Sequence, residues 1–151
     1  MFNDFFEVLK ENHFAEKPVD AKTFVESPDY LGQPPLSEIQ YGIVEAMSQI
    51  YRKDDVVDII GEGGEEYFKK YTKNELILQL GKGSGKDFVS TVACAYVVYK
   101  LLCLKDPAVY YGKPAGDAID IINVAVNAQQ AKNVFFKGFK TKIEKSPWFA
   151  G

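Results

Sequence analysis

The sequence is poor in the residue types from which many catalytic and metal sites are built. Its 151 residues include one histidine (His13), one arginine (Arg52) and two cysteines (Cys94 and Cys103). One histidine leaves no basis for a nucleophile triad, and two cysteines with one histidine do not complete a structural zinc site. Any role that requires a planar guanidinium group falls to Arg52 alone. The cysteines point to opposite faces of one predicted helix, so we expect free thiols and a reducing, cytoplasmic setting.

Long apolar runs are also missing. No stretch reaches the roughly 20 apolar residues that a membrane-spanning helix needs, so we expect no membrane partner. Residues 1–14 carry acidic side chains and lack a clean apolar run, which is not the pattern of a signal peptide. A net charge of −3 argues against a protein that coats nucleic acid, although a local lysine patch can still contact DNA. The length and the 46% hydrophobic content predict one domain with an ordinary core.

The first part of the chain predicts helices and a connector. Residues 1–14 have the pattern of a short amphipathic helix, and residues 15–35, with four prolines, read as an extended connector. Ser37 and Gln40 have the spacing of a capping box, which predicts a helix from about residue 36 to residue 52. Within residues 53–74, the apolar run at 56–60 fits either a strand or a continued helix, and both interpretations stay open. Three glycines break this run, and residues 65–70 read as a short helical or irregular bridge.

The stretch ELILQLGKGSGKD, residues 75–87, is the part of the sequence that points most clearly to chemistry. It predicts a strand at 75–80, a glycine-rich loop, and then a long apolar helix at 88–104. Alternating glycines allow successive backbone N–H groups to face one anion, and a helix start adds more N–H groups and a positive dipole end. The standard phosphate-binding pattern is G-x-x-x-x-G-K-[ST]. Here Leu80 replaces its first glycine and Asp87 replaces its hydroxyl residue.

A second strand and helix follow this stretch. Residues 118–126 form an apolar, β-branched run that predicts a buried strand, and residues 128–145 have the pattern of an amphipathic helix. Strand, loop, helix, strand and helix are the order of a parallel, three-layer α/β domain. Two strands do not make a buried sheet, so further strands must complete it.

The loop residues each have a possible role and a plainer alternative. Lys86 can reach the outer phosphates of a nucleotide, and Lys82 can stabilise charge at the γ-phosphate or be a solvated surface lysine. Asp87 is either an ordinary aspartate in a first helical turn or a group that lies near Mg²⁺, since a carboxylate beside a triphosphate needs a cation between them.

Polar residues outside the loop supply further candidates. The amide of Gln40 can bond both a donor and an acceptor on an adenine edge, although the capping box already explains this residue. Asn127 and Gln130 lie where the second predicted strand meets its helix, at the sheet edge where α/β proteins bind ligands. Together with Gln129, they can touch a phosphate backbone or couple the nucleotide to a partner, or they can be a polar helix start. No acidic pair follows a predicted strand, so the carboxylates that an ATPase requires are not found.

Four segments together resemble the N-terminal part of a tailed-bacteriophage terminase large subunit, the ATPase motor that packages viral DNA. They are PLSEIQ at 35–40, LGKGSGKDF at 80–88, NVAVNAQQA at 123–131 and FFKGFKTKIEKSPWF at 135–149. The resemblance runs from about residue 24 to the end of the chain. It is most specific in the loop, where this family often departs from the standard pattern and carries aspartate in some members.

The resemblance implies a site for ATP and Mg²⁺. Gln40 would read adenine, Lys82 would stand where the family often has an arginine that acts on the γ-phosphate, and Asp87 would lie at Mg²⁺. Lys82 and Lys86 would be the catalytic cations, and Asn127 and Gln130 would belong to the segment that couples nucleotide to DNA. The implied ATP-binding residues are Gln40, Gly81, Lys82, Gly83, Ser84, Gly85, Lys86 and Asp87.

The resemblance also implies the setting of the protein. The expected fold is a P-loop NTPase three-layer α/β fold with a parallel sheet, present as its N-terminal part over residues 36–151 after a 1–35 helix and connector. The Walker B acids and a nuclease domain are expected beyond residue 151, so this chain should bind ATP but hardly hydrolyse it. The implied partners are double-stranded DNA, a small terminase subunit, a portal and other copies in a ring. The implied location is the infected bacterial cytoplasm and the procapsid vertex.

Two other interpretations stay open. The chain can belong to a different P-loop protein, such as a helicase-like or kinase-like module, with an accidental likeness to terminases. It can also be a non-enzymatic scaffold whose loop is degenerate. Nucleotide binding separates the scaffold from the other two.

Overall fold

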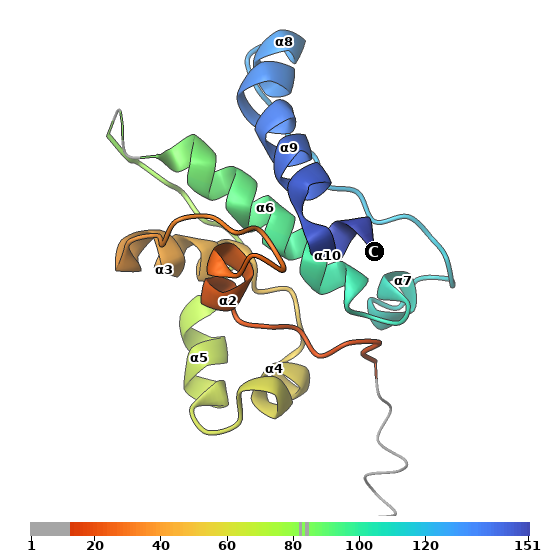
Figure 1. The fold of residues 1–151 in the computed structure, drawn as a ribbon. Helices are drawn as coiled ribbons and strands as arrows, with labels where there is room; N and C mark the ends of the chain where they lie inside the picture. The colour runs from red at the N-terminus through yellow and green to blue at the C-terminus, as the bar shows by residue number, and fades with distance from the viewer. Residues whose placement is uncertain (1–12, 82, 84) are drawn as a thin grey trace, which may run out of the picture.

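The computed structural model describes residues 13–81, 83 and 85–151, and the described part of the chain is helical (Figure 1). The predicted helix at 1–14 lies almost entirely outside these residues. In chain order the helices are α2 (Ala21–Glu26), α3 (Glu38–Met47), α4 (Lys53–Ile60), α5 (Gly64–Tyr71), α6 (Lys86–Leu102), α7 (Pro107–Tyr110), α8 (Ala128–Gln130), the π-helix η1 (Ala131–Phe136), α9 (Lys137–Lys145) and α10 (Pro147–Ala150).

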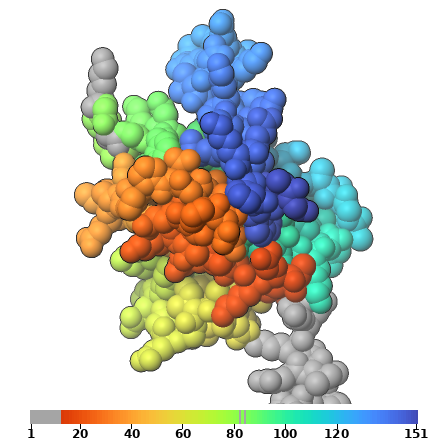
Figure 2. Space-filling model, in the orientation of Figure 1, coloured from red at the N-terminus to blue at the C-terminus, as the bar shows by residue number. Residues whose placement is uncertain are grey.

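Helix α6 is the centre of the fold, as its apolar sequence predicts. It packs against α2, α3, η1 and α9, and most of its residues between Val89 and Lys100 are buried. The ring of Phe24 in α2 is fully buried and lies 4.8 Å from the ring of Tyr99 in α6, measured between centroids. The segments around α2 and α3 also meet the C-terminal helices in the space-filling view (Figure 2). The backbone N–H of Trp148 donates a hydrogen bond to the carbonyl of Asp29.

Two tyrosine hydroxyls attach the N-terminal connector to α6. The hydroxyl of Tyr99 accepts a hydrogen bond from the backbone N–H of Val19 at 2.9 Å, and the hydroxyl of Tyr96 donates to the carbonyl of Val19 at 2.8 Å. The backbone N–H and carbonyl of Val19 therefore both have hydrogen-bond partners beside a buried helix, which removes the cost of desolvating them. The connector is therefore part of the core, and it contains α2 in addition to extended chain. The domain division at residue 35 stays a prediction.

The predicted capping box at the start of α3 is confirmed. The Ser37 side chain accepts from the Gln40 backbone N–H, and the Gln40 side chain accepts from the Ser37 backbone N–H. The helix ends at Met47 instead of near residue 52. Ser48 is buried, and its carbonyl accepts a hydrogen bond from the ammonium group of Lys100 in α6, so the chain leaves the helix at that point.

The two predicted strands are not formed in the described part of the chain. Residues 75–80 and 118–126 are extended, but the pairing seen between separate segments is a single bridge from Phe14 to Leu104. Ile122 is 81% exposed and Val124 is 85% exposed, which is unusual for β-branched residues. A strand is stabilised by paired edges and a covered face, and these segments have neither. The parallel sheet is thus absent from these residues.

The structure agrees with the predictions for the C-terminal helix and the cysteines, and it resolves the open segment at 53–74. The open segment 53–74 is helical and forms α4 and α5. The predicted helix at 128–145 is confirmed, although six residues in its first half form a π-helix. Both cysteines are free thiols.

The α4–α5 pair depends on a buried glycine. A Cβ atom on Gly64 would lie 2.9 Å from the Cα of Val57 in α4, which is closer than real contacts allow. We predict that Gly64→Ala destabilises the protein by about 1–3 kcal/mol, because α4 and α5 must move apart. Chemical denaturation measures the change.

Gly42→Ala is the matched control. Gly42 lies inside α3, and its Cβ would meet nothing within 4 Å, so alanine should be neutral or stabilising by up to about 1 kcal/mol. Equal stability of Gly64→Ala and the wild type would contradict the packing described here.

Candidate phosphate-binding site

The glycine-rich loop leads directly into α6. Gly83 has a φ of +81° and Gly85 a φ of +77°, so both adopt the left-handed conformation that favours glycine. Gly85 is the residue that caps α6, and Lys86 is the first residue of the helix. Lys82 and Ser84 lie outside the described residues. The backbone of Gly85 therefore turns the chain so that a lysine stands at the mouth of a long helix, as the sequence pattern predicts.

The start of α6 can receive an anion. The carbonyl of Gly85 accepts from the N–H of Val89 at 2.9 Å, which closes the first helical turn. The N–H groups within that first turn have no partner inside the helix, and the helix dipole adds positive potential there. Gly81, Gly83, Gly85, Lys86 and Asp87 are all exposed. The loop thus presents donors and a cation to the solvent.

Gln40 lies beside the loop, although 45 positions separate it from Gly85. Its Nε2 atom is 3.3 Å from the position that a Cβ atom of Gly85 would occupy. Its Oε1 atom accepts from the Ser37 N–H at 2.9 Å, which fixes the orientation of the amide. The structure therefore brings together the two residues that the sequence assigned to adenine and phosphate. The start of α3 and the start of α6 form one local site.

Asp87 and Gln130 belong to a second part of the site. They line a groove of about 670 Å³ between α6, residues 121–126 and the start of the C-terminal helices. Asn127 has a structural role, because its Oδ1 atom accepts from the Gln130 backbone N–H at 2.8 Å and caps α8. Asn127 therefore forms the polar start of the helix. A coupling role for Asn127 stays a prediction. Gln130 lines the same groove as Asp87.

These residues can hold a Mg²⁺ ion only if waters and nucleotide phosphates supply most of its ligands. Within the described ranges, no three His, Cys, Asp or Glu side chains gather in a way that could hold a metal ion. Asp87 is a single exposed carboxylate at the helix start. Mg²⁺ commonly binds proteins through one or two carboxylates, keeping waters and nucleotide phosphates as its other ligands. The single carboxylate of Asp87, next to a candidate phosphate-binding loop, is consistent with this mode of Mg²⁺ binding.

Lys142 is a neighbour of the loop that the sequence did not assign. Its ammonium group lies 4.6 Å from the ring centroid of Phe88, in the first turn of α6. Partial burial lowers the pKa of Lys142. Only the packing of α9 against α6 creates this proximity, and no local signal in the sequence predicts it.

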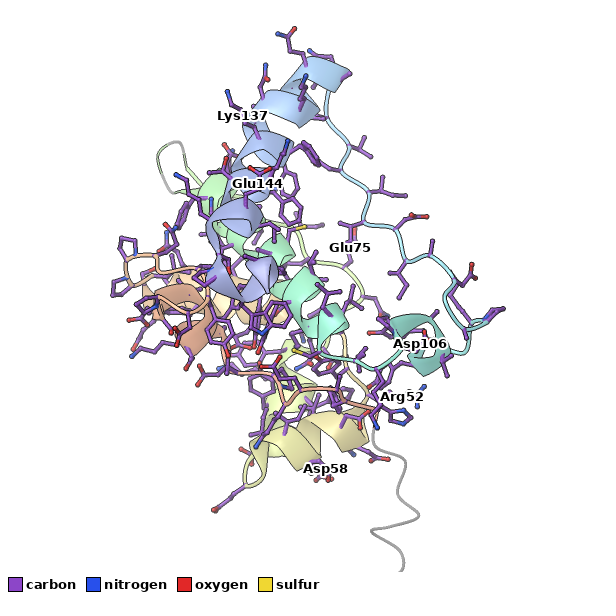
Figure 3. All side chains as sticks on the ribbon, turned by 45° about the vertical axis from the view of Figure 1, so that its right-hand side comes forward. Arg52, Asp58, Glu75, Asp106, Lys137 and Glu144 are labelled. Carbon is purple, nitrogen blue, oxygen red and sulfur yellow. The ribbon has the colours of Figure 1, made fainter. Side chains whose placement is uncertain are left out.

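Arg52 contacts Tyr110 of α7 and not the described residues of the glycine-rich loop. Its guanidinium group lies 4.4 Å from the ring centroid of Tyr110 and donates to the carbonyl of the same residue. Figure 3 shows Arg52 next to α7, away from the loop. The one arginine of the chain joins α4 to α7 and does not supply the planar group that a nucleotide site would use.

A left-handed glycine at the start of a buried helix, followed by an exposed lysine, is the local geometry expected of a phosphate-binding loop. Residues 2–151 match the model of the family described as "Uncharacterized protein MJ0330, N-terminal P-loop domain", and the chain belongs to that family. The uncharacterized protein MJ0330 of Methanocaldococcus jannaschii is 47% identical over 64 residues.

That similarity covers 42% of this chain and 11% of the archaeal protein, so the chain aligns with a small part of its relative. No solved structure matches. No helix within the described ranges is long and apolar enough to cross a membrane. The matched family is not described as a terminase, and the resemblance to terminases therefore stays a prediction from the sequence.

Proposed function

We propose that the chain binds ATP together with Mg²⁺ through residues 81–87, as the nucleotide-binding segment of a larger P-loop ATPase. The observation that carries this proposal is the local site at the start of α6, where Gly85, Lys86 and Gln40 meet. The family assignment to a P-loop domain supports it. The longer archaeal relative supports the view that other parts of a whole protein contribute the remaining functions.

Each residue has a defined task in this proposal. The N–H groups of the loop and of the first α6 turn bind the phosphates, and Lys86 neutralises the outer ones. Lys82 acts on the γ-phosphate, and Gln40 bonds the edge of the adenine base. Mg²⁺ would supply charge neutralisation when bound, and Asp87 would hold a water of its shell or the ion itself.

The extended segments complete the proposed fold when they find partners. Residues 75–80 and 118–126 become parallel strands once neighbouring strands pair with them, and their exposed β-branched side chains support this proposal. No acidic pair follows either segment in the sequence. Binding without appreciable hydrolysis is therefore what we expect from this chain.

ATP titration with Mg²⁺ tests the proposal. We predict measurable affinity for the wild type and a loss of tenfold or more for Lys86→Ala, because a bond to a charged group contributes about 1.5–3 kcal/mol. Chelation of Mg²⁺ should abolish binding, and Asp87→Ser should soften this dependence because it removes a carboxylate near the phosphates. Lys70→Ala, an exposed lysine on α5, is the control. Equal wild-type affinity with and without Mg²⁺ would contradict the role of Asp87, and no binding at all would favour a scaffold.

A second experiment separates the two roles of Gln40. Gln40→Leu and Ser37→Ala both remove the capping box and should each lower the free energy of unfolding by about 1 kcal/mol. Only Gln40→Leu should lower the preference for ATP over GTP, by about 1–3 kcal/mol, since a paired amide–base contact is lost. If both variants keep the same ATP-to-GTP affinity ratio as the wild type, Gln40 is a capping residue alone.

A more specific version of the proposed function is a DNA-packaging role in a terminase-like motor. It rests on the sequence resemblance and gains support from the charge of residues 131–145, which carry five lysines and one acid, Glu144. Lys137, Lys142 and Lys145 line one hollow of about 380 Å³ on α9, and Figure 3 shows Lys137 and Glu144 toward opposite ends of that helix. Double-stranded DNA, a small terminase subunit, a portal, a homo-oligomeric ring and the procapsid vertex of an infected bacterium belong to this proposal.

DNA binding at several salt concentrations tests the lysine cluster. We predict weak, sequence-independent binding of a short duplex, and the double variant Lys137→Gln/Lys145→Gln should reduce the salt slope by about 2, because two phosphate contacts are lost. Lys69→Gln/Lys70→Gln on α5 changes the net charge equally and should leave the slope nearer that of the wild type. Equal effects of the two double variants would contradict a specific α9 contact.

A further inference from the structure

A separate hollow of about 410 Å³ lies on the other half of α6 from the loop. It is bounded by residues 17–20 of the connector and by side chains of α3, α4, α5 and α6, and we name it the second pocket. Lys100, on its wall, follows Lys86 by fourteen residues. At about 1.5 Å per residue, the second pocket lies roughly 20 Å along the helix from the phosphate loop. It is therefore not part of the loop site.

Gln49 lines the second pocket, and its side-chain amide has no hydrogen-bond partner in the described structure. The Nε2 and Oε1 atoms of this amide are both buried. A buried polar group without a partner costs about 1–3 kcal/mol, and here a donor and an acceptor are both affected. Such a pair is satisfied by a molecule that presents an acceptor and a donor side by side.

Lys100 provides a second polar group on the same wall. It is only 6% exposed, and its ammonium group donates to the carbonyl of Ser48 at 2.8 Å. An ammonium group has three donors, and this bond uses one of them. Burial lowers the pKa of Lys100 to about 8, while the nearby carboxylate of Glu45 acts in the opposite direction. Glu45, whose carboxylate accepts from the Tyr67 hydroxyl, lines the pocket as well.

The other walls are flat and apolar. Tyr51 and Tyr96 are 5% and 4% exposed as residues, and the Lys100 ammonium group lies over the ring of each, at 4.6 Å and 5.4 Å from the centroids. Val56 and Ile59 of α4 add aliphatic surface. Aromatic and aliphatic walls with a few convergent polar groups are the usual surroundings of a planar small molecule, and the volume is within the usual range for such pockets.

We propose that the second pocket binds a planar nitrogen heterocycle of the nucleobase class that carries a ring N–H beside a carbonyl. On binding, the Gln49 side chain turns so that its buried amide reaches the hollow. The ring N–H then donates to Oε1, the adjacent carbonyl accepts from Nε2, and a further polar edge meets Lys100. Guanine and uracil carry this arrangement. The proposal goes beyond ATP binding at residues 81–87, and it does not depend on that function.

Calorimetric titration of the full chain with guanosine and with uridine tests the proposal. At least one of them should bind, and 3-methyluridine and 1-methylguanosine, which lack the ring N–H, should bind at least tenfold more weakly than their parents. Gln49→Leu should lose the parent's binding by a similar factor. The same variant should be as stable as the wild type or more stable, because it removes two buried polar atoms without partners. A merely structural glutamine would destabilise the protein when replaced.

Lys86→Ala separates this site from the loop. It should leave guanosine and uridine affinity unchanged, even if it abolishes ATP binding, and ATP binding in turn should survive Gln49→Leu. The proposal is overturned if neither nucleoside binds at millimolar concentration, if the methylated compounds bind as well as their parents, or if Gln49→Leu retains binding. Loss of nucleoside binding in Lys86→Ala would overturn it too, because the base would then occupy the loop site.

Discussion

The burial of α6 is the constraint on which the rest of the structure depends. A seventeen-residue helix with tyrosines and a lysine on its inner faces can be buried only if those polar groups find partners. Tyr96 and Tyr99 bond the backbone of Val19, and Lys100 bonds the carbonyl of Ser48. These bonds fix the connector and the end of α3 against the helix. The position of the glycine loop then follows, because the loop is continuous with the buried helix.

Parts of this arrangement could be predicted from the sequence and parts could not. The capping box at Ser37 and Gln40, the long helix after the loop and the glycine turn are local signals, and the structure contains all of them. The predictions of strands at 75–80 and 118–126 were wrong for the described residues. A strand needs neighbouring strands to pair with, and a local sequence pattern does not contain them. Short apolar runs such as the one before Gly61 fit a strand or a helix equally well, and α4 resolves that ambiguity only in three dimensions.

The surroundings of the candidate sites were the least predictable feature. Gln40 was assigned by its residue type, but its place beside Gly85 depends on how α3 packs against α6. The proximity of Lys142 to Phe88 depends likewise on α9. Lys100 reads in the sequence as one polar residue in an apolar helix. Only the fold shows that it is buried and that it lines a pocket together with Glu45 and Gln49. Both candidate sites lie along α6, with the loop at its start and the second pocket near its end.

Nucleotide phosphates, in our proposal, bind to the backbone of the loop and of the first turn of α6. Hydrogen–deuterium exchange of the full chain with and without Mg²⁺ and ADP tests it most directly, since it reports on the amide groups themselves. The account predicts that nucleotide slows exchange in residues 83–89, with little change in α4 and α5. Unchanged exchange in residues 83–89 under conditions where ADP is shown to bind would contradict it.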